Sequence, residues 1–140
     1  MRLQLALNVD DLDQAIEFYA KMFGTTPAKT KPGYANFAIE DPPLKLVLFE
    51  GAGPDGSINH LGVETETAAE VVAAEARLAD SGLVTTGVDE TICCDAEKTE
   101  TWVHAPDGNR WEWCVKQGDT DQLANIVVSS STGASTGCCS

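Results

Sequence analysis

The sequence predicts an α+β domain built from two copies of one module, in which a strand leads into a helix and three further strands follow. Three observations predict it. Residues 4–9 and 60–65 are short strand-like segments that each run into a stretch with helical spacing of apolar residues. Short extended segments separated by turn residues follow both helices, and a glycine- and proline-containing stretch at 51–56 lies between the two copies.

In the first module, Asp11 is a suitable N-cap with Gln14 three residues later, and Gly24 is a suitable stop for the helix. Three strands are expected after this helix, and the first of them is only weakly marked. They cover residues 28–31, 34–39 and 44–50.

In the second module, Thr67 and Glu70 have the spacing of a capping box, and Gly82 is expected to end the helix. The strands of this module are expected at residues 84–92, 99–104 and 110–116. The two modules therefore cover about 1–50 and 57–117, and together they form one folded domain, 1–117.

After Gln117 the composition changes to glycine, serine, threonine and aspartate. Such a segment offers few side chains to a core, so residues 118–140 are predicted to be a flexible tail that ends in Cys138 and Cys139.

Composition excludes several classes of function. The chain has 140 residues with 22 acidic against 9 basic side chains and a formal charge of −13, which disfavours nucleic acid as a partner. No apolar run approaches the ~20 residues that a membrane span needs. Gln4 and Asn8 interrupt the N-terminal segment, which therefore lacks the pattern of a secretory signal. We expect a cytoplasmic protein that contacts neither nucleic acid nor membrane.

Strand periodicity places three polar residues where a metal ligand is plausible. Gln4 and His60 hold equivalent positions in the first strands of the two modules, on the face opposite the apolar residues. Glu112 lies between two tryptophans, and a carboxylate in such a strand is costly unless it is paired or binds a cation. The pattern predicts a divalent metal site with open positions. The alternatives are a hydrogen-bonded strand histidine and an edge-strand ion pair.

Four of the five cysteines form adjacent pairs, Cys93-Cys94 and Cys138-Cys139, and an odd count disfavours a disulfide framework. Cys93 and Cys94 are expected in a turn, where a reduced dithiol is a soft, bidentate site for a thiophilic centre such as trivalent arsenic or cadmium. Two inert buried thiols are the alternative. Cys114 either lines a cavity on the face that carries Glu112 or is only a packing residue. Cys138 and Cys139 either form a thiol relay or have no role in the folded protein.

Several of these features occur together in one superfamily. The paired modules, the stretch 8–19 and the stretch 106–112 resemble the vicinal-oxygen-chelate superfamily of glyoxalases, extradiol dioxygenases and antibiotic-resistance proteins, over residues 1 to about 116. The resemblance implies a concave mixed sheet around a metal, with Gln4, His60 and Glu112 as ligands. The extradiol dioxygenases carry histidine where this chain has Gln4.

The Cys93-Cys94 pair ahead of the Thr101-Trp102-Val103 segment further resembles the ArsI/CadI family of carbon–arsenic lyases and cadmium-induced proteins. This implies an Fe(II)- and dioxygen-dependent enzyme of arsenic resistance that converts trivalent organoarsenicals, such as methylarsenite or aromatic arsenicals, to arsenite. Cys93 and Cys94 would be catalytic and bind the arsenic, with Lys98 at the edge of a closing turn as a further substrate contact.

The sequence is also compatible with other functions. One alternative is a cadmium- or arsenite-binding resistance protein without turnover, and another is a glyoxalase- or fosfomycin-resistance-type metalloenzyme. Other divalent metals would also fit the site. The sequence leaves open whether methyl or aryl arsenicals are preferred, and whether the chain is a monomer or a homodimer.

Overall fold

The computed structural model describes residues 1–93, 96–119 and 126–130. It divides into two compact units, which we call the first unit (Arg2–Gly62) and the second unit (Val63–Ser140, with Met1). The boundary lies inside a strand, several residues after the linker at 51–56 from which the second module was expected to begin. Along the chain, a strand, a helix and three further strands follow one another twice, so the predicted repeat is confirmed, although the opening strand of the second copy lies mostly in the first unit.

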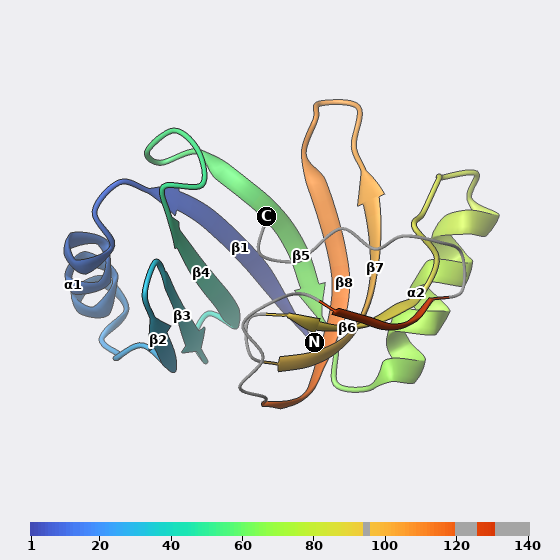
Figure 1. The fold of residues 1–140 in the computed structure, drawn as a ribbon, viewed down its shortest axis with the longest axis horizontal. Coiled ribbons are helices and arrows are strands. Elements are labelled where there is room, and N and C mark those ends of the chain that lie inside the picture. The colour runs from blue at the N-terminus through green and yellow to red at the C-terminus, as the bar shows by residue number, and fades with distance from the viewer. Residues whose placement is uncertain (94–95, 120–125, 131–140) are drawn as a thin grey trace. The chain divides into compact units, whose positions relative to one another are not determined.

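The first unit is a mixed sheet with one helix on it (Figure 1). Its strands lie in the order β2-β3-β4-β1-β5; β1 and β4 are parallel, and β3 is antiparallel to both β2 and β4. The elements are β1 (Arg2–Val9), α1 (Leu12–Phe23), β2 (Lys29–Lys31), β3 (Tyr34–Ile39), β4 (Leu44–Glu50) and β5 (Ile58–Glu64).

Helix α1 begins and ends where the sequence predicts. The Asp11 carboxylate accepts a hydrogen bond from the Gln14 backbone N–H at 3.0 Å, and Gly24 ends the helix with a φ of 63°, a left-handed conformation that suits glycine. The apolar face of α1 packs on a core that includes Phe37 and Leu48, both fully buried. Because β1 alternates its faces, its other face carries polar side chains away from this core.

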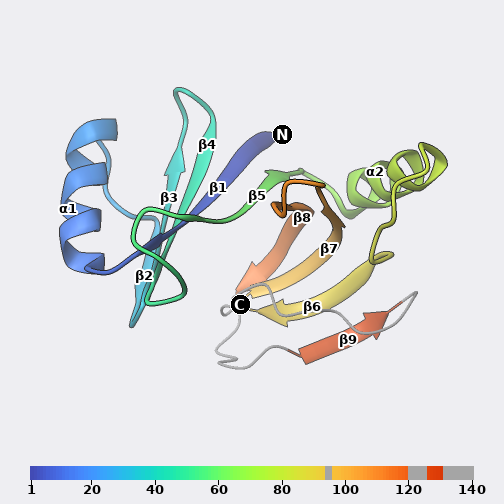
Figure 2. The same ribbon diagram turned by 90° about the horizontal axis from the view of Figure 1, so that it is seen from above.

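The second unit is an antiparallel sheet with α2 packed on β7 and β8. Figure 2 shows its strands side by side in the order β8-β7-β6-β9. The predicted capping box of α2 is present between Thr67 and Glu70. The elements are α2 (Ala68–Asp80), β6 (Asp89–Cys93), β7 (Ala96–His104), β8 (Arg110–Asp119) and β9 (Ile126–Ser130).

Two strand boundaries in this unit differ from the expectation. Strand β6 begins at Asp89 rather than Val84, because Gly87 has a φ of 79° and the hydroxyl of Thr85 binds its N–H. Strand β7 begins at Ala96 rather than Thr99, because Ala96 already pairs with Cys93 of β6. Lys98 therefore lies within a strand and not at the edge of a turn, where we expected it.

The C-terminal segment also differs from the expected flexible tail. Strand β8 continues to Asp119, and residues 126–130 form β9 on the open edge of β6. The β-branched run Ile126-Val127-Val128 favours such a strand. Residues 120–125 and 131–140 lie outside the described residues, so the domain limit at 117 stays a prediction. Within the described residues, no helix is long and apolar enough to cross a membrane.

Candidate metal and substrate site

The first unit brings together two of the predicted site residues. Gln4 on β1 and His60 on β5 are 5% and 2% exposed, and the Gln4 side-chain nitrogen lies 2.9 Å from Nε2 of His60. The two strands are separated by more than fifty residues in sequence, and the equivalent positions predicted from the repeat lie within hydrogen-bond distance. An amide and an imidazole are thus buried side by side.

A chain of hydrogen bonds runs from the other side of the imidazole into the loop after β4. Nδ1 of His60 lies 2.8 Å from Oδ1 of Asn59, whose amide nitrogen donates to Oδ1 of Asn8 at 3.0 Å. The Asn8 amide donates to the Ser57 hydroxyl at 3.0 Å, and that hydroxyl donates to the Pro54 carbonyl at 2.5 Å. We call Asn59, Asn8, Ser57 and Pro54 the amide relay.

The second unit holds the third predicted ligand in a cluster of charges. Glu112 on β8 is fully buried, and its carboxylate accepts a hydrogen bond from the Lys98 ammonium. The same ammonium lies 3.1 Å from Oε2 of Glu100, which is also fully buried. We call Lys98, Glu100 and Glu112 the charged cluster. Glu112 is thus held by an ion pair, which is the alternative to a metal ligand that the sequence left open.

The charged cluster lies on the face of the sheet that points away from α2. The Arg77 guanidinium of α2 lies 6.0 Å from the centre of the Trp113 ring, which fixes Trp113 on the helix side of β8. Glu112 and Cys114 alternate with Trp113 and therefore point to the opposite side.

Burial and mutual charge shift the ionisation of the cluster. Burial raises the pKa of Glu100 to about 7, with the Lys98 charge lowering it and the Glu112 charge raising it further. Burial alone would lower the pKa of Lys98, but Glu112, Cys114 and Glu100 outweigh burial and hold this pKa well above the ordinary value. Lys98 is therefore an ammonium, and the Glu100 carboxyl group titrates near neutral pH.

More polar groups are buried on the same face. Asp89 on β6 is 1% exposed and lies directly opposite Glu100 in the strand register. Among the described residues, Oδ1 of Asp89 and the hydroxyl of Thr91 have no hydrogen-bond partner. Three carboxyl groups thus share a buried face with one ammonium.

The remaining predicted residues divide into placed and unplaced. Cys114 is a free thiol, 1% exposed, and it shares the face of Glu112. Cys93 ends β6, but its side chain is outside the described part of the chain, as are Cys94, Cys138 and Cys139. In the described ranges, no group of three or more histidine, cysteine, aspartate or glutamate side chains could hold a metal ion. The predicted ligand set has two such residues and one amide.

Sequence reasoning missed several participants, among them Glu100 and Asn59. Glu100 carried a signal, because it lies in a strand where Thr99 and Thr101 flank it and an acidic residue needs a partner. Asn59 carried none. Neighbouring strand residues normally point to opposite faces, so its contact with His60 could not be expected from the strand period.

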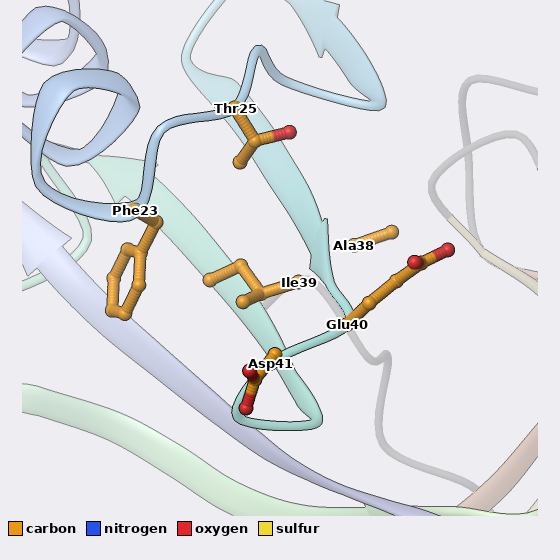
Figure 3. Close-up of a pocket in the computed structure, with 6 residues that line it drawn as sticks. All are labelled: Phe23, Thr25, Ala38, Ile39, Glu40 and Asp41. Atoms are coloured by element: carbon orange, nitrogen blue, oxygen red, sulfur yellow. The ribbon is translucent and has the colours of Figure 1, made fainter.

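The pocket in Figure 3 belongs to the first unit. It lies where α1 ends and β3 turns toward β4. Its lining residues are Phe23, Thr25, Ala38, Ile39, Glu40 and Asp41. None of them is a predicted site residue, and the lining contains no histidine or cysteine.

The sequence is similar to characterised protein families over most of its length. It matches the Glyoxalase/Bleomycin resistance protein/Dioxygenase superfamily over residues 3–113. It is 56% identical to the "Trivalent organoarsenical cleaving enzyme" of Thermomonospora curvata over 124 residues, 88% of this chain and 82% of that protein. It is 52% identical to the "Cadmium-induced protein CadI" of Mycobacterium tuberculosis, with 89% and 82% covered.

Solved structures share the fold. The Mn(II)-bound glyoxalase from Novosphingobium aromaticivorans has a TM-score of 0.61 at 19% identity, over 86% of this chain and 41% of that one. Homoprotocatechuate 2,3-dioxygenase from Arthrobacter globiformis has a TM-score of 0.59 at 22% identity, over 86% and 37%. At these identities, the likeness concerns the fold alone.

Proposed function

Because this chain belongs to the glyoxalase/bleomycin resistance protein/dioxygenase superfamily, and within it to the family of trivalent organoarsenical cleaving enzymes and cadmium-induced proteins, we propose that it cleaves the carbon–arsenic bond of trivalent organoarsenicals. The observation that carries this proposal is the 56% identity to a protein with that name over 88% of the chain. The product is arsenite, and the role is arsenic resistance. Methylarsenite and trivalent aromatic arsenicals are the proposed substrates.

The metal of this proposal is Fe(II), held by Gln4, His60 and Glu112. Each of the three residues suits that role in its own unit. Nε2 of His60 is buried 2.9 Å from the side-chain nitrogen of Gln4. Rotating the Gln4 amide by half a turn would place its oxygen, the atom that can bind metal, where its nitrogen now lies. Glu112 is a fully buried carboxylate that already contacts an ammonium. One imidazole, one carboxylate and one amide oxygen form a donor set typical of Fe(II) or Mn(II).

When bound, Fe(II) supplies a redox-active Lewis acid with open positions for dioxygen. The protein supplies burial and charge around it. His60 and Glu112 are 2% and 0% exposed, so the surrounding protein excludes water from these two ligand side chains. The Lys98 ammonium remains 3.1 Å from Glu100, where it compensates part of the acidic surplus. Lys98 is proposed as a substrate contact through the same charge.

Substrate binding in this proposal belongs to Cys93 and Cys94, which would hold arsenic as a dithiolate. Two thiolates suit the soft trivalent arsenic, whereas the oxygen and nitrogen ligands suit the harder iron. Holding the arsenic in place converts bond cleavage into an effectively intramolecular step. The adjacency of the two cysteines and the family to which the chain belongs support this assignment. The side chains of Cys93 and Cys94 lie outside the described residues.

Turnover tests the proposal directly. Purified protein is loaded with Fe(II) without oxygen, given an excess of methylarsenite and then exposed to air, and arsenite is measured by chromatography with arsenic detection. We expect many equivalents of arsenite per protein, none without air, and none from the Cys93→Ser/Cys94→Ser double variant. If the arsenite formed never exceeds one equivalent per protein, the proposed lyase function is refuted.

The metal ligands are tested by metal content. Glu112→Ala should lose Fe(II) on desalting because the only carboxylate of the set is gone, whereas Gln4→Ala should bind more weakly but retain metal. Asp107→Ala is a matched control at an exposed turn carboxylate that hydrogen-bonds only locally, to the Asn109 backbone at 2.9 Å. Equal metal in wild type and Glu112→Ala, measured by elemental analysis, would refute the ligand set.

A second function is stoichiometric binding of cadmium or arsenite without turnover. The relatives named cadmium-induced protein, at 52% identity, and the two cysteine pairs favour keeping it. It predicts tight binding of one or two ions by thiols and no arsenite released after air is admitted. The turnover experiment therefore separates the two functions.

A further inference from the structure

We infer that Asn59 is a positioning residue that holds the His60 imidazole with its proton on Nδ1, so that Nε2 faces Gln4 as an electron-pair donor. The inference concerns residues of the first unit only. It deepens the proposed function by naming the residue that orients one proposed metal ligand. The tautomer itself is independent of that function, and only its role in metal binding rests on it.

The direction of the relay fixes the proton. A backbone carbonyl has no hydrogen to give, so the Ser57 hydroxyl donates to Pro54, at 2.5 Å, and accepts from the Asn8 amide nitrogen. The Asn8 oxygen then accepts from the Asn59 amide nitrogen, which leaves the Asn59 oxygen toward the ring at 2.8 Å. An amide oxygen only accepts, so Nδ1 of His60 carries the hydrogen.

This tautomer is the one that a metal ligand requires at Nε2. A neutral imidazole donates a hydrogen bond from one nitrogen and offers a lone pair at the other. With the hydrogen on Nδ1, the lone pair lies on Nε2, 2.9 Å from the side-chain nitrogen of Gln4. Hydrogen-bond partners of this kind commonly fix the ring orientation of metal-binding histidines and strengthen the ligand.

The backbone holds the relay in place. The N–H of Asn8 donates to the Ser57 carbonyl at 2.9 Å, and the N–H of Gly56 donates to the Asn8 carbonyl at 2.8 Å. Gly53 leaves room for the Asn8 amide, because a Cβ at position 53 would lie 2.6 Å from its nitrogen. Gly53→Ala should therefore displace the Asn8 amide and disturb the relay without touching His60 or Asn59.

The tautomer is measurable in the metal-free protein. The chain has two histidines, His60 and the exposed His104, so the imidazole nitrogens of ¹⁵N-labelled protein are readily assigned by two-dimensional NMR. At about pH 8.5, where imidazoles are ordinarily neutral, we expect His60 with hydrogen on Nδ1. His104 serves as the internal reference. A wild-type spectrum with the hydrogen on Nε2 of His60 would overturn the inference.

Variants separate positioning from a general structural role. In Asn59→Leu the ratio of the Nδ1–H to the Nε2–H form should fall about fivefold or more, the equivalent of one hydrogen bond. Asn59→Asp retains an acceptor and should keep the wild-type tautomer. Asn36→Leu removes a partly buried amide of the same unit that binds the Tyr34 hydroxyl at 2.9 Å, and should leave His60 unchanged.

If Asn59→Leu fails to fold, Gly53→Ala supplies the same comparison, with a smaller shift of the tautomer ratio expected. An unchanged ratio in a folded Asn59→Leu or in Gly53→Ala would contradict the inference. Titration with Mn(II) adds a second measurement, in which Asn59→Leu should bind about 10- to 100-fold more weakly than Asn36→Leu. The tautomer is measured without metal or arsenical. The inference about Asn59 can therefore be refuted while arsenite release is observed, and it can hold while arsenite release is absent.

Discussion

The two units of the chain both bury polar side chains on strands, but they satisfy these groups by different physical means. In the first unit, His60 lies between the amides of Gln4 and Asn59, and each contact is a hydrogen bond to an uncharged amide, of 2.8 to 2.9 Å. In the second unit, Lys98 lies between two fully buried carboxyl groups, Glu100 and Glu112.

This difference assigns different tasks to the two units. A hydrogen-bonded network of amides has a direction, so it orients the His60 ring without adding charge of its own. A buried charged cluster with more acid than base is sensitive to pH and to any added cation. The first unit is therefore suited to positioning a ligand, and the second to binding positive charge.

The largest expected effect comes from breaking the charged cluster. Lys98→Met leaves two buried carboxyl groups without their ammonium, and should lower the free energy of unfolding at pH 7 by about 3 to 5 kcal/mol in the metal-free protein. Gln4→Met, which removes the amide hydrogen bond to His60 in the first unit, should cost about 1 kcal/mol. Urea unfolding measures both.

Lys21→Met is the matched control for the lysine. Its ammonium contacts Glu17 at 2.8 Å, but the two side chains are 76% and 68% exposed, so little change is expected. If Lys98→Met costs no more than Gln4→Met, the contrast between the charged and the neutral unit fails.

The next effect is a dependence of stability on pH. The pKa of Glu100 is raised from 4.5 to about 7, so the folded protein prefers the protonated carboxyl group. This contribution is complete below about pH 4.5 and is lost as pH rises through 7. Metal-free protein should lose on the order of 3 kcal/mol between pH 5 and pH 8.5 from this group. The pKa of Lys98 is raised above its ordinary value, so its contribution persists throughout that range.

Glu100→Gln should flatten this dependence, since glutamine does not titrate. Unfolding curves at several pH values would show it, with Glu97→Gln as a control on an exposed strand residue. A wild-type stability that rises from pH 5 to pH 8.5 would contradict the assignment to Glu100.

The smallest effect concerns the helices, where the two units are alike. Asp11 and Thr67 each accept a hydrogen bond from the backbone three residues later, at 3.0 and 3.3 Å. Asp11→Ala and Thr67→Ala should each lower the free energy of unfolding by about 1 kcal/mol. Thermal unfolding followed by circular dichroism measures both, and a clear inequality would show that the helix starts also differ.

Much of the architecture follows from local patterns. Apolar spacing, caps and turn residues predicted both helices and the repeat, because these signals are carried by neighbours in sequence. The strand limits at Asp89 and Ala96 were less predictable. They depend on the conformation of Gly87 and on the pairing of Cys93 with Ala96, and a single sequence shows neither.

The candidate site was predictable to the extent that strand period and repeat determine it. The strand period and the repeat together placed Gln4 and His60 on equivalent faces, and the 2.9 Å between their side chains agrees with this placement. The contacts of Lys98 with Glu112 and of Asn59 with His60 were not predictable. Both depend on side-chain conformation and on strand register, which are set by packing.

The sequence alone determines the repeat, the helix limits and which face of each strand is polar, because residue spacing and backbone geometry decide these. Only the tertiary structure decides which polar groups meet. It directs the Asn59 oxygen to the His60 ring and the Lys98 ammonium to Glu112. The physical reason is that a hydrogen bond or ion pair requires ångström-scale placement, and the packing of strands distant in sequence supplies it.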